Sequence, residues 1–205
     1  GYYNTANGAW ALLSNTTGLE NTSNGTYALY LNTIGSFNPA TGAGALALSE
    51  TGSLNTANGW YALSSNYTGS NNTATGSHAL ANNTTGYSNV AMGIHSLYRS
   101  ISHSNLVAIG DSALYNNGVG AVTSFDATAN TAVGSKALFT NSTGYNNAAT
   151  GYQALYSNTT GSQNTANGVY ALFSNTIGNG NTSGGVQALY FNTAGDNNTA
   201  NGYQA

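Results

Sequence analysis

A 17-residue repeat runs through the whole chain and limits what it can fold into more than any other feature. The units begin at residues 4, 21, 38, 55, 72, 89, 106, 130, 147, 164, 181 and 198. The interval between the starts at 106 and 130 exceeds one period by seven residues, which predicts a loop insertion within residues 118–128. A fixed short period is typical of a solenoid, in which each unit forms one coil and neighbouring coils share a core.

Aligned units show which positions the fold keeps constant, counting from the first residue of each unit. Position 5 is Gly in all twelve units, and position 9 is Leu in all eleven units that reach it. Position 3 is Ala except for Ser23 and Ser183, position 8 is Ala except for Ser96, and position 1 is Asn except for Leu106. Positions 6, 7, 16 and 17 vary freely, as solvent-facing positions do in an array.

The local sequence favours strands over helices. A unit with two Gly and an Asn-Thr-Thr-Gly segment leaves no stretch of the roughly 10 to 12 residues that a packed helix needs. We expect a short strand at the Asn-Thr-Ala segment, a second strand at positions 8–11 and a return turn at positions 12–15, with Gly at positions 5 and 15 supplying positive φ at two corners. The prediction is an all-β parallel β-solenoid of about twelve coils stacked about 4.8 Å apart.

The two Asn columns have a structural interpretation in such a rod. Asn occupies position 1 almost throughout and position 12 in nine of eleven units. Stacked side-chain amides can hydrogen-bond from coil to coil along the axis, as in Asn ladders. We therefore expect both columns to be scaffold. Asn-x-Ser/Thr glycosylation sequons also occur here, at Asn15 and Asn158 for example, because a repeat rich in Asn and Thr generates them automatically.

Core size suggests association between chains. One Leu and two Ala per coil bury little apolar surface, and strand alternation would place positions 8 and 10 on the face opposite the Leu column. We interpret that outer face as packing against another chain, the alternative being an aromatic ladder on the outside of a single solenoid. The residues of this predicted seam are Tyr98, Tyr115, Phe139, Tyr156, Phe173 and Tyr190, with Ala154, Ala171 and Ala188.

Three segments carry a resemblance to a known family. Asn-Val-Ala-Met-Gly at 89–93, Leu-Val-Ala-Ile-Gly followed by Asp-Ser-Ala-Leu at 106–114, and the segment at 130–138 are similar to the head repeats of YadA-type trimeric autotransporter adhesins. Similar repeats occur in fibre proteins that end in an endosialidase-type chaperone domain. The resemblance implies a left-handed β-roll, three chains side by side as a homotrimer, and display outside the cell or on a virion fibre.

Composition excludes several classes of function. Only 3% of residues are charged, with two Lys plus Arg and five Asp plus Glu, so phosphate binding and therefore nucleic acid are not expected. Acid-base catalysis needs positioned titratable groups that are scarce here, which disfavours an enzyme. The chain has no Cys and no apolar run of about 18 residues, so neither disulfides nor membrane insertion is expected. No cofactor is predicted.

A few residues are candidates for chemistry. His78 and His95 share position 7 of successive coils, and we expect a stacked surface pair rather than a metal site because no carboxylate or Cys accompanies them. His103 replaces Gly at position 15 and indicates an irregular coil. The acids are scattered, which argues against a paired-carboxylate glycosidase site, and calcium is not expected. In the insertion, Phe125 and Asp126 are the predicted contact residues.

Two functions remain open. The first is a non-enzymatic structural and adhesive segment of an extracellular fibre, part of a longer fibre or stacked end to end as a filament, that holds a host, mineral, ice or glycan surface through repeated weak contacts. The second is an ice-binding or carbohydrate-binding solenoid that uses a flat Thr/Asn face. Pro39, Val90, Val107 and Ala148 interrupt the Thr column at position 2, which favours the first.

Overall fold

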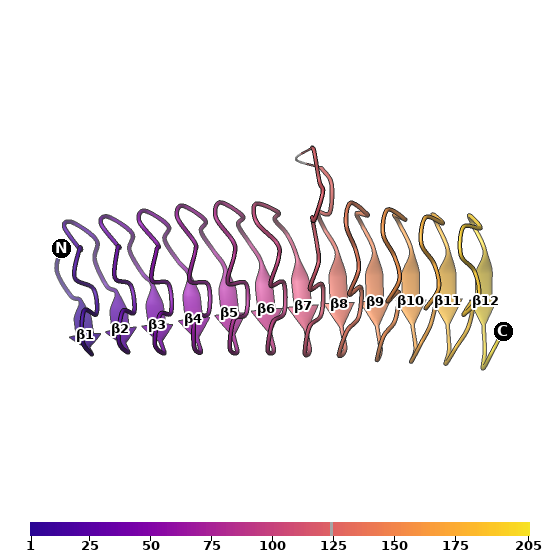
Figure 1. Cartoon of the computed structure of the whole chain (residues 1–205), viewed down its shortest axis with the longest axis horizontal. Helices are drawn as coiled ribbons and strands as arrows, with labels where there is room; N and C mark the ends of the chain where they lie inside the picture. The colour runs from indigo at the N-terminus through magenta and orange to yellow at the C-terminus, as the bar shows by residue number, and fades with distance from the viewer. Residues whose placement is uncertain (124) are drawn as a thin grey trace.

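The computed structural model describes residues 1–123 and 125–205, which form a rod of stacked coils (Figure 1). Each coil of the described chain contributes one three-residue strand to a twelve-stranded parallel sheet, whose strands follow one another in chain order. The strands are β1 Thr5–Asn7, β2 Thr22–Asn24, β3 Pro39–Thr41, β4 Thr56–Asn58, β5 Thr73–Thr75, β6 Val90–Met92, β7 Val107–Ile109, β8 Thr131–Val133, β9 Ala148–Thr150, β10 Thr165–Asn167, β11 Thr182–Gly184 and β12 Thr199–Asn201. The predicted all-β parallel solenoid is confirmed.

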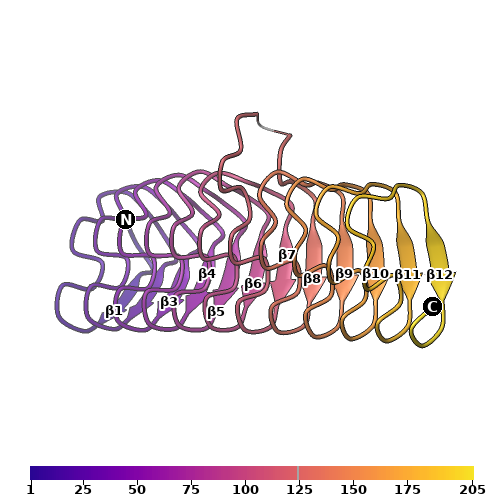
Figure 2. The same cartoon turned by 45° about the vertical axis from the view of Figure 1, so that its right-hand side comes forward.

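Sheet register follows the sequence repeat. Thr5 of β1 lies beside Thr22 of β2, 17 residues later, and this offset recurs along the rod. Across the insertion, Val107 of β7 pairs with Thr131 of β8, so the sheet continues unbroken although 24 residues separate the two strands. The extra residues leave the rod as a projecting loop (Figure 2).

Glycine acts differently at its two columns. At position 5, Gly168 has φ +146, and a Cβ there would lie 2.3 Å from the carbonyl oxygen of Gly185 in the next coil, so the predicted corner is confirmed. At position 15, Gly161 lies outside the positive-φ region, and the prediction for that column is wrong. Glycine is needed there for space, because a Cβ would lie 2.4 Å from the carbonyl oxygen of Gly178 and 2.5 Å from Oδ1 of Asn158.

The predicted second strand at positions 8–11 is wrong. His78 at position 7 and Leu80 at position 9 have φ +55 and +51, a left-handed conformation incompatible with a regular strand. Backbone groups still bond from coil to coil, as in the Leu80 N–H donating to the Ser96 carbonyl at 2.9 Å. Because the alternation is broken, Ala79 and Leu80 are both fully buried.

The core is closed within one chain. The Leu column lies inside, as predicted, flanked by the Ala residues of positions 3 and 8. Leu106, which replaces Asn at position 1, is also fully buried. The fully buried position-9 leucines are Leu29, Leu46, Leu63, Leu80, Leu97, Leu114, Leu138, Leu155 and Leu172.

Both Asn columns form the predicted ladders. At position 1, Nδ2 of Asn164 donates to the Gly178 carbonyl at 2.8 Å, and its Oδ1 accepts the Asn181 N–H at 2.9 Å. At position 12, Nδ2 of Asn83 donates to Oδ1 of Asn66 at 2.7 Å. Most buried ladder amides thus pair with one another and with the turn carbonyls along the axis, whereas Oδ1 of Asn32 and Oδ1 of Asn83, each followed by a Ser at position 12 of the next coil, have no partner in the described residues.

Candidate functional site

The insertion between β7 and β8 is a loop at whose base the chain completes the same hydrogen-bonded coil as elsewhere in the rod. Nδ2 of Asn117 donates to the Ala127 carbonyl at 2.9 Å. Elsewhere the position-12 Asn makes the same bond to the position-15 Gly, so Ala127 takes position 15 and the coil closes behind the loop. The described residues of this segment, 118–123 and 125–126, are therefore excluded from the rod and project from it (Figure 2).

Asp126 holds the loop together rather than facing outward. Its Oδ2 accepts the N–H groups of Val122 and Thr123, each at 3.0 Å, and these bonds hold the pKa of the Asp126 carboxyl below its usual value. Oγ1 of Thr128 donates to the Phe125 carbonyl at 2.8 Å on the other side of the loop. One oxygen of the predicted contact residue Asp126 is thus occupied inside the loop, where a carboxylate organises the turn.

Two apolar side chains are presented to solvent on this loop. Val122 is 90% exposed and Phe125 is 80% exposed. Sequence reasoning named Phe125 but missed Val122, which is one of two valines in the insertion and has no local signal that sets it apart. The loop therefore offers an apolar contact surface on a backbone fixed by Asp126 and Thr128.

His103 lies beneath the loop. It is 7% exposed, and its ring packs against Gly118, where a Cβ would lie 2.0 Å from Cε1. Its Nδ1 has no hydrogen-bond partner in the described part of the chain. Burial lowers the pKa of the His103 imidazole, and the negative charge of Asp126 opposes this in part. Ser100 replaces Asn at position 12 of the same coil, and its buried hydroxyl has no partner in the described residues.

His78 and His95 lie next to each other in successive coils, as predicted, with ring centroids 5.4 Å apart, but their planes are tilted by 36° rather than stacked. Trp60 lies 4.7 Å from His78 and Tyr98 lies 5.2 Å from His95, and the Ser77 hydroxyl lies 3.0 Å from Nδ1 of His78. Burial, then the charge of His95, lowers the pKa of His78. Within residues 1–123 and 125–205, no three His, Asp or Glu side chains gather as metal ligands would, and no helix has the length and apolarity to cross a membrane.

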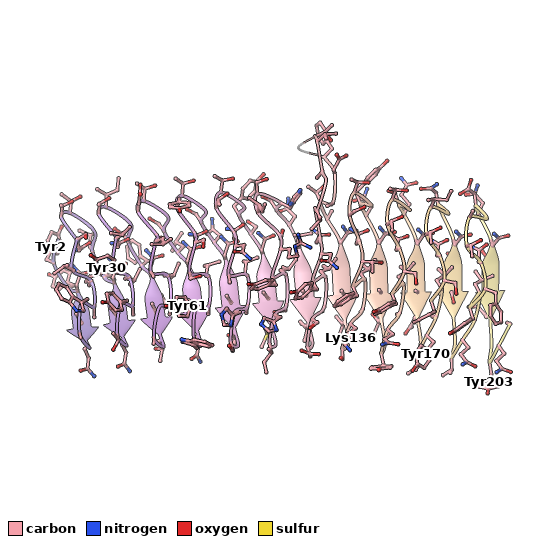
Figure 3. The ribbon with its side chains drawn as sticks, viewed as in Figure 1. Tyr2, Tyr30, Tyr61, Lys136, Tyr170 and Tyr203 are labelled. Carbon is pink, nitrogen blue, oxygen red and sulfur yellow. The ribbon has the colours of Figure 1, made fainter. Side chains whose placement is uncertain are left out.

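The aromatic residues of position 10 form a stacked column on the outside of the rod. Neighbouring centroids lie 5.0 to 5.4 Å apart, with planes inclined by 5 to 23°. The stacked residues are Tyr98, Tyr115, Phe139, Tyr156, Phe173 and Tyr190. Their faces cover one another, so each half-buried ring offers mainly its edge to a partner. Figure 3 shows other aromatic side chains, such as those of Tyr30, Tyr61 and Tyr170, also on the outside of the rod.

The alanines of the predicted seam are not on the surface. Ala154, Ala171 and Ala188 are each 0% exposed in the single chain, so the prediction that position 8 lies on an outer face is wrong. The left-handed residue at position 9 is the cause, because Leu155 and Leu172 have φ +51 and the strand alternation fails there. Association of chains through the aromatic column stays a prediction.

The outer face of the sheet carries a second regular array. Its Thr hydroxyls at position 2 make no hydrogen bond within the described residues. The Thr hydroxyls of position 13, outside the sheet, differ in this respect: Oγ1 of Thr176 donates to the Thr193 carbonyl at 2.9 Å. No charged or aromatic residue occupies positions 2 or 4. The centre of the face is apolar, with Val90, Met92, Val107, Ile109 and Val133.

No protein-family model matches this chain, and neither a curated protein nor a solved structure matches it. Assignment of function therefore depends on the residues and geometry described above.

Proposed function

We propose that this chain is a non-enzymatic structural and adhesive segment of an extracellular surface fibre, whose rod displays one contact loop. The observation that carries the proposal is the pair Val122 and Phe125, exposed on a loop whose backbone is held by Asp126. Exposed apolar side chains gathered on a surface loop are typical of contact sites.

The surroundings of the loop support this assignment. Most coils repeat one pattern, but the two before β8 depart from it at several columns. Ser100 stands where position 12 is usually Asn, His103 where position 15 is usually Gly, and Leu106 where position 1 is usually Asn. These changes lie beside the insertion, where the His103 ring packs against Gly118. The rod is therefore adapted locally to carry the loop.

The chemistry of the loop fits weak, repeated adhesion. Burying Val122 and Phe125 against an apolar partner surface would contribute about 1.5 to 3 kcal/mol each before association costs. A single contact of that size gives low affinity. Several fibres engaging together would raise the overall avidity, because each further contact is intramolecular.

The proposal is tested by tethering rods to a force probe and measuring how often they adhere to a surface. One surface is a methyl-terminated monolayer, and the other is a hydroxyl-terminated monolayer for comparison. We expect wild type to adhere to the methyl surface and Val122→Ser with Phe125→Ser to adhere about tenfold less often. Phe37→Ser with Leu54→Ser is the matched control, because these side chains are 44% and 56% exposed away from the loop. Equal losses in the two variants would argue against a specific role for the loop.

Ice binding is a second candidate, favoured by the Thr hydroxyls of the sheet that have no partner within the described chain. An uncharged face of hydroxyl, amide and methyl groups suits an ordered water lattice, and without aromatic rings it offers no stacking platform for sugars. Inhibition of ice recrystallisation is the measurement. Thr165→Tyr, on the sheet, should abolish any such activity, and Thr160→Tyr, exposed on another face, should not. Wild type without activity would remove this candidate.

A further inference from the structure

Eleven asparagines of the chain stand in Asn-x-Ser/Thr sequons, the acceptor pattern for N-linked glycans. The structure divides them by exposure. Asn24, Asn71 and Asn197 are exposed, and Asn15 and Asn82 are partly buried. The six that are 0% exposed are Asn21, Asn66, Asn83, Asn141, Asn158 and Asn181.

In the six buried sequons the acceptor atom is engaged in the ladders. An N-linked glycan is attached through Nδ2 of Asn. In Asn141 this atom donates to Oδ1 of Asn117 at 2.8 Å and to the Gly144 carbonyl at 2.9 Å, which uses both of its N–H groups. A glycosidic linkage would remove one N–H and with it one of these bonds.

The ladders also have no room for a sugar. A single Cβ added to Gly144 would lie 2.2 Å from the carbonyl oxygen of Gly161 and 2.5 Å from Oδ1 of Asn141. The next coil stacks directly on each ladder amide, as Asn158 does on Asn141. A glycan at a buried ladder position would separate two coils and break the shared core.

We infer that a glycan on any of these six asparagines is incompatible with the rod. It follows that this chain is made by a route on which its sequons do not meet the N-glycan transferase before folding. The transferase acts on extended chain, in which every sequon is accessible, so glycans added at that stage would prevent the coils from stacking and burying the ladders. This inference is independent of the contact loop and narrows the routes by which the proposed fibre reaches a surface.

The chain itself suggests substitutions that remove the buried sequons without touching the ladder amides. Position 14 already holds Ile34 and Ile177 in place of Thr, and position 3 is usually Ala. The six-sequon variant combines Thr68→Ile, Thr85→Ile, Thr143→Ile, Thr160→Ile, Ser23→Ala and Ser183→Ala. The control variant removes the exposed sequons through Thr26→Ala, Thr73→Val and Thr199→Val, residues that other coils carry at those positions.

The test is secretion of the full chain, behind a cleavable signal peptide, from cells that attach N-linked glycans. Folded rod is measured by protease resistance and circular dichroism, and occupancy of each Asn by mass spectrometry. We expect several-fold more folded rod from the six-sequon variant than from wild type, and recovery of wild type when the transferase is inhibited. The control variant should give no more than wild type.

Two results would overturn the inference. One is folded rod that carries a glycan on any of the six asparagines. The other is an equal yield of folded wild type and six-sequon variant with the transferase active. As a control, wild type and the six-sequon variant are also made in a bacterial cytoplasm, where no N-linked glycan is attached. Equal melting temperatures of these two proteins exclude an effect of the substitutions on stability itself.

Discussion

Nδ2 of Asn158 donates a hydrogen bond to Oδ1 of Asn141, 17 residues earlier in the chain, at 2.9 Å, and both side chains are fully buried. The same Nδ2 also donates to the Gly161 carbonyl at 2.8 Å, and Oδ1 of Asn158 accepts from Asn175 in the following coil at 2.9 Å. The Asn158 amide therefore joins three coils and one turn carbonyl. Removing one amide leaves partners unpaired on both sides.

Asn158→Ala should destabilise the rod strongly. It leaves Oδ1 of Asn141 and one N–H of Asn175 unpaired, and each unsatisfied buried group costs about 1 to 3 kcal/mol. The Gly161 carbonyl keeps a second donor, Nδ2 of Asn147 at 2.8 Å. We expect a loss of about 3 to 5 kcal/mol in the free energy of unfolding, measured by denaturant titration. A loss below about 1 kcal/mol would mean that the ladder contributes little.

Ser49→Asn should stabilise the rod, because the ladder is interrupted there. Ser49 occupies position 12, and within residues 1–123 and 125–205 neither the hydroxyl of Ser49 nor Oδ1 of Asn32, both buried, has a partner. An amide at this position can donate to Asn32 and accept from Asn66, which gains about 1 to 2 kcal/mol. Thermal melting measures the gain. A lower melting temperature would show that the coil has no space for the amide.

Leu80→Asn tests the core. Leu80 is fully buried with φ +51, a conformation that Asn adopts more readily than Leu. The backbone gain is outweighed by lost apolar burial and a buried amide, so we expect a net loss of about 3 kcal/mol. Leu80→Met, which keeps the volume, should cost less than about 1.5 kcal/mol. Similar unfolding midpoints for Leu80→Asn and wild type would contradict the interior position of the column.

Stability should fall in acid because of His103. Its pKa in the fold is lowered from the ordinary value of 6.5 mainly by burial, so the unfolded chain binds the proton more readily. The full stability is present above about pH 6.5 and declines as the pH falls through that value. His78 acts in the same direction, since its pKa is also lowered.

The denaturation midpoint at about pH 8 and about pH 5 measures this dependence. His103→Gly restores the residue usual at position 15 and should remove part of the decline, with His78 contributing the rest. A pH dependence unchanged by His103→Gly would contradict burial of the neutral ring.

Ala171→Glu tests whether the position-8 alanine is buried inside one chain or packs against another chain. Ala171 is 0% exposed within one chain, so a carboxylate there enters the core and should unfold neighbouring coils at every protein concentration. Circular dichroism reports the loss. A variant that keeps its fold and changes only its sedimentation would mean that position 8 faces another chain.

The repeat predicts the rod because the same residue types recur at fixed positions of the unit. Gly at the position of Gly168 and Leu at the position of Leu172 recur in every coil that reaches these positions, and only a stack of coils explains that constancy. The second strand was mispredicted because Leu80 and His78 adopt positive φ, which their residue types rarely do. Stacked neighbours impose this conformation through hydrogen bonds between coils, and a single unit carries no local sign of it.

The candidate site was only partly predictable. The change in period locates the insertion, and Phe125 stands out in it as a large apolar residue. The part played by Asp126 depends on the turn that brings the N–H groups of Val122 and Thr123 to its carboxylate, and spacing alone does not give that turn. Packing of His103 against Gly118 is likewise a tertiary contact.

Replacement of residues 118–126 by Thr-Thr tests the central claim most directly, because it restores a 17-residue coil and removes only the loop. Ala127→Gly and His103→Gly accompany it, since both residues take position 15 and that position of a regular coil has no room for a Cβ. Frequency of adhesion to the methyl-terminated monolayer is the measurement, with circular dichroism and melting to verify the rod. The account predicts a folded rod with adhesion reduced at least tenfold. A folded rod that adheres as well as wild type would contradict it.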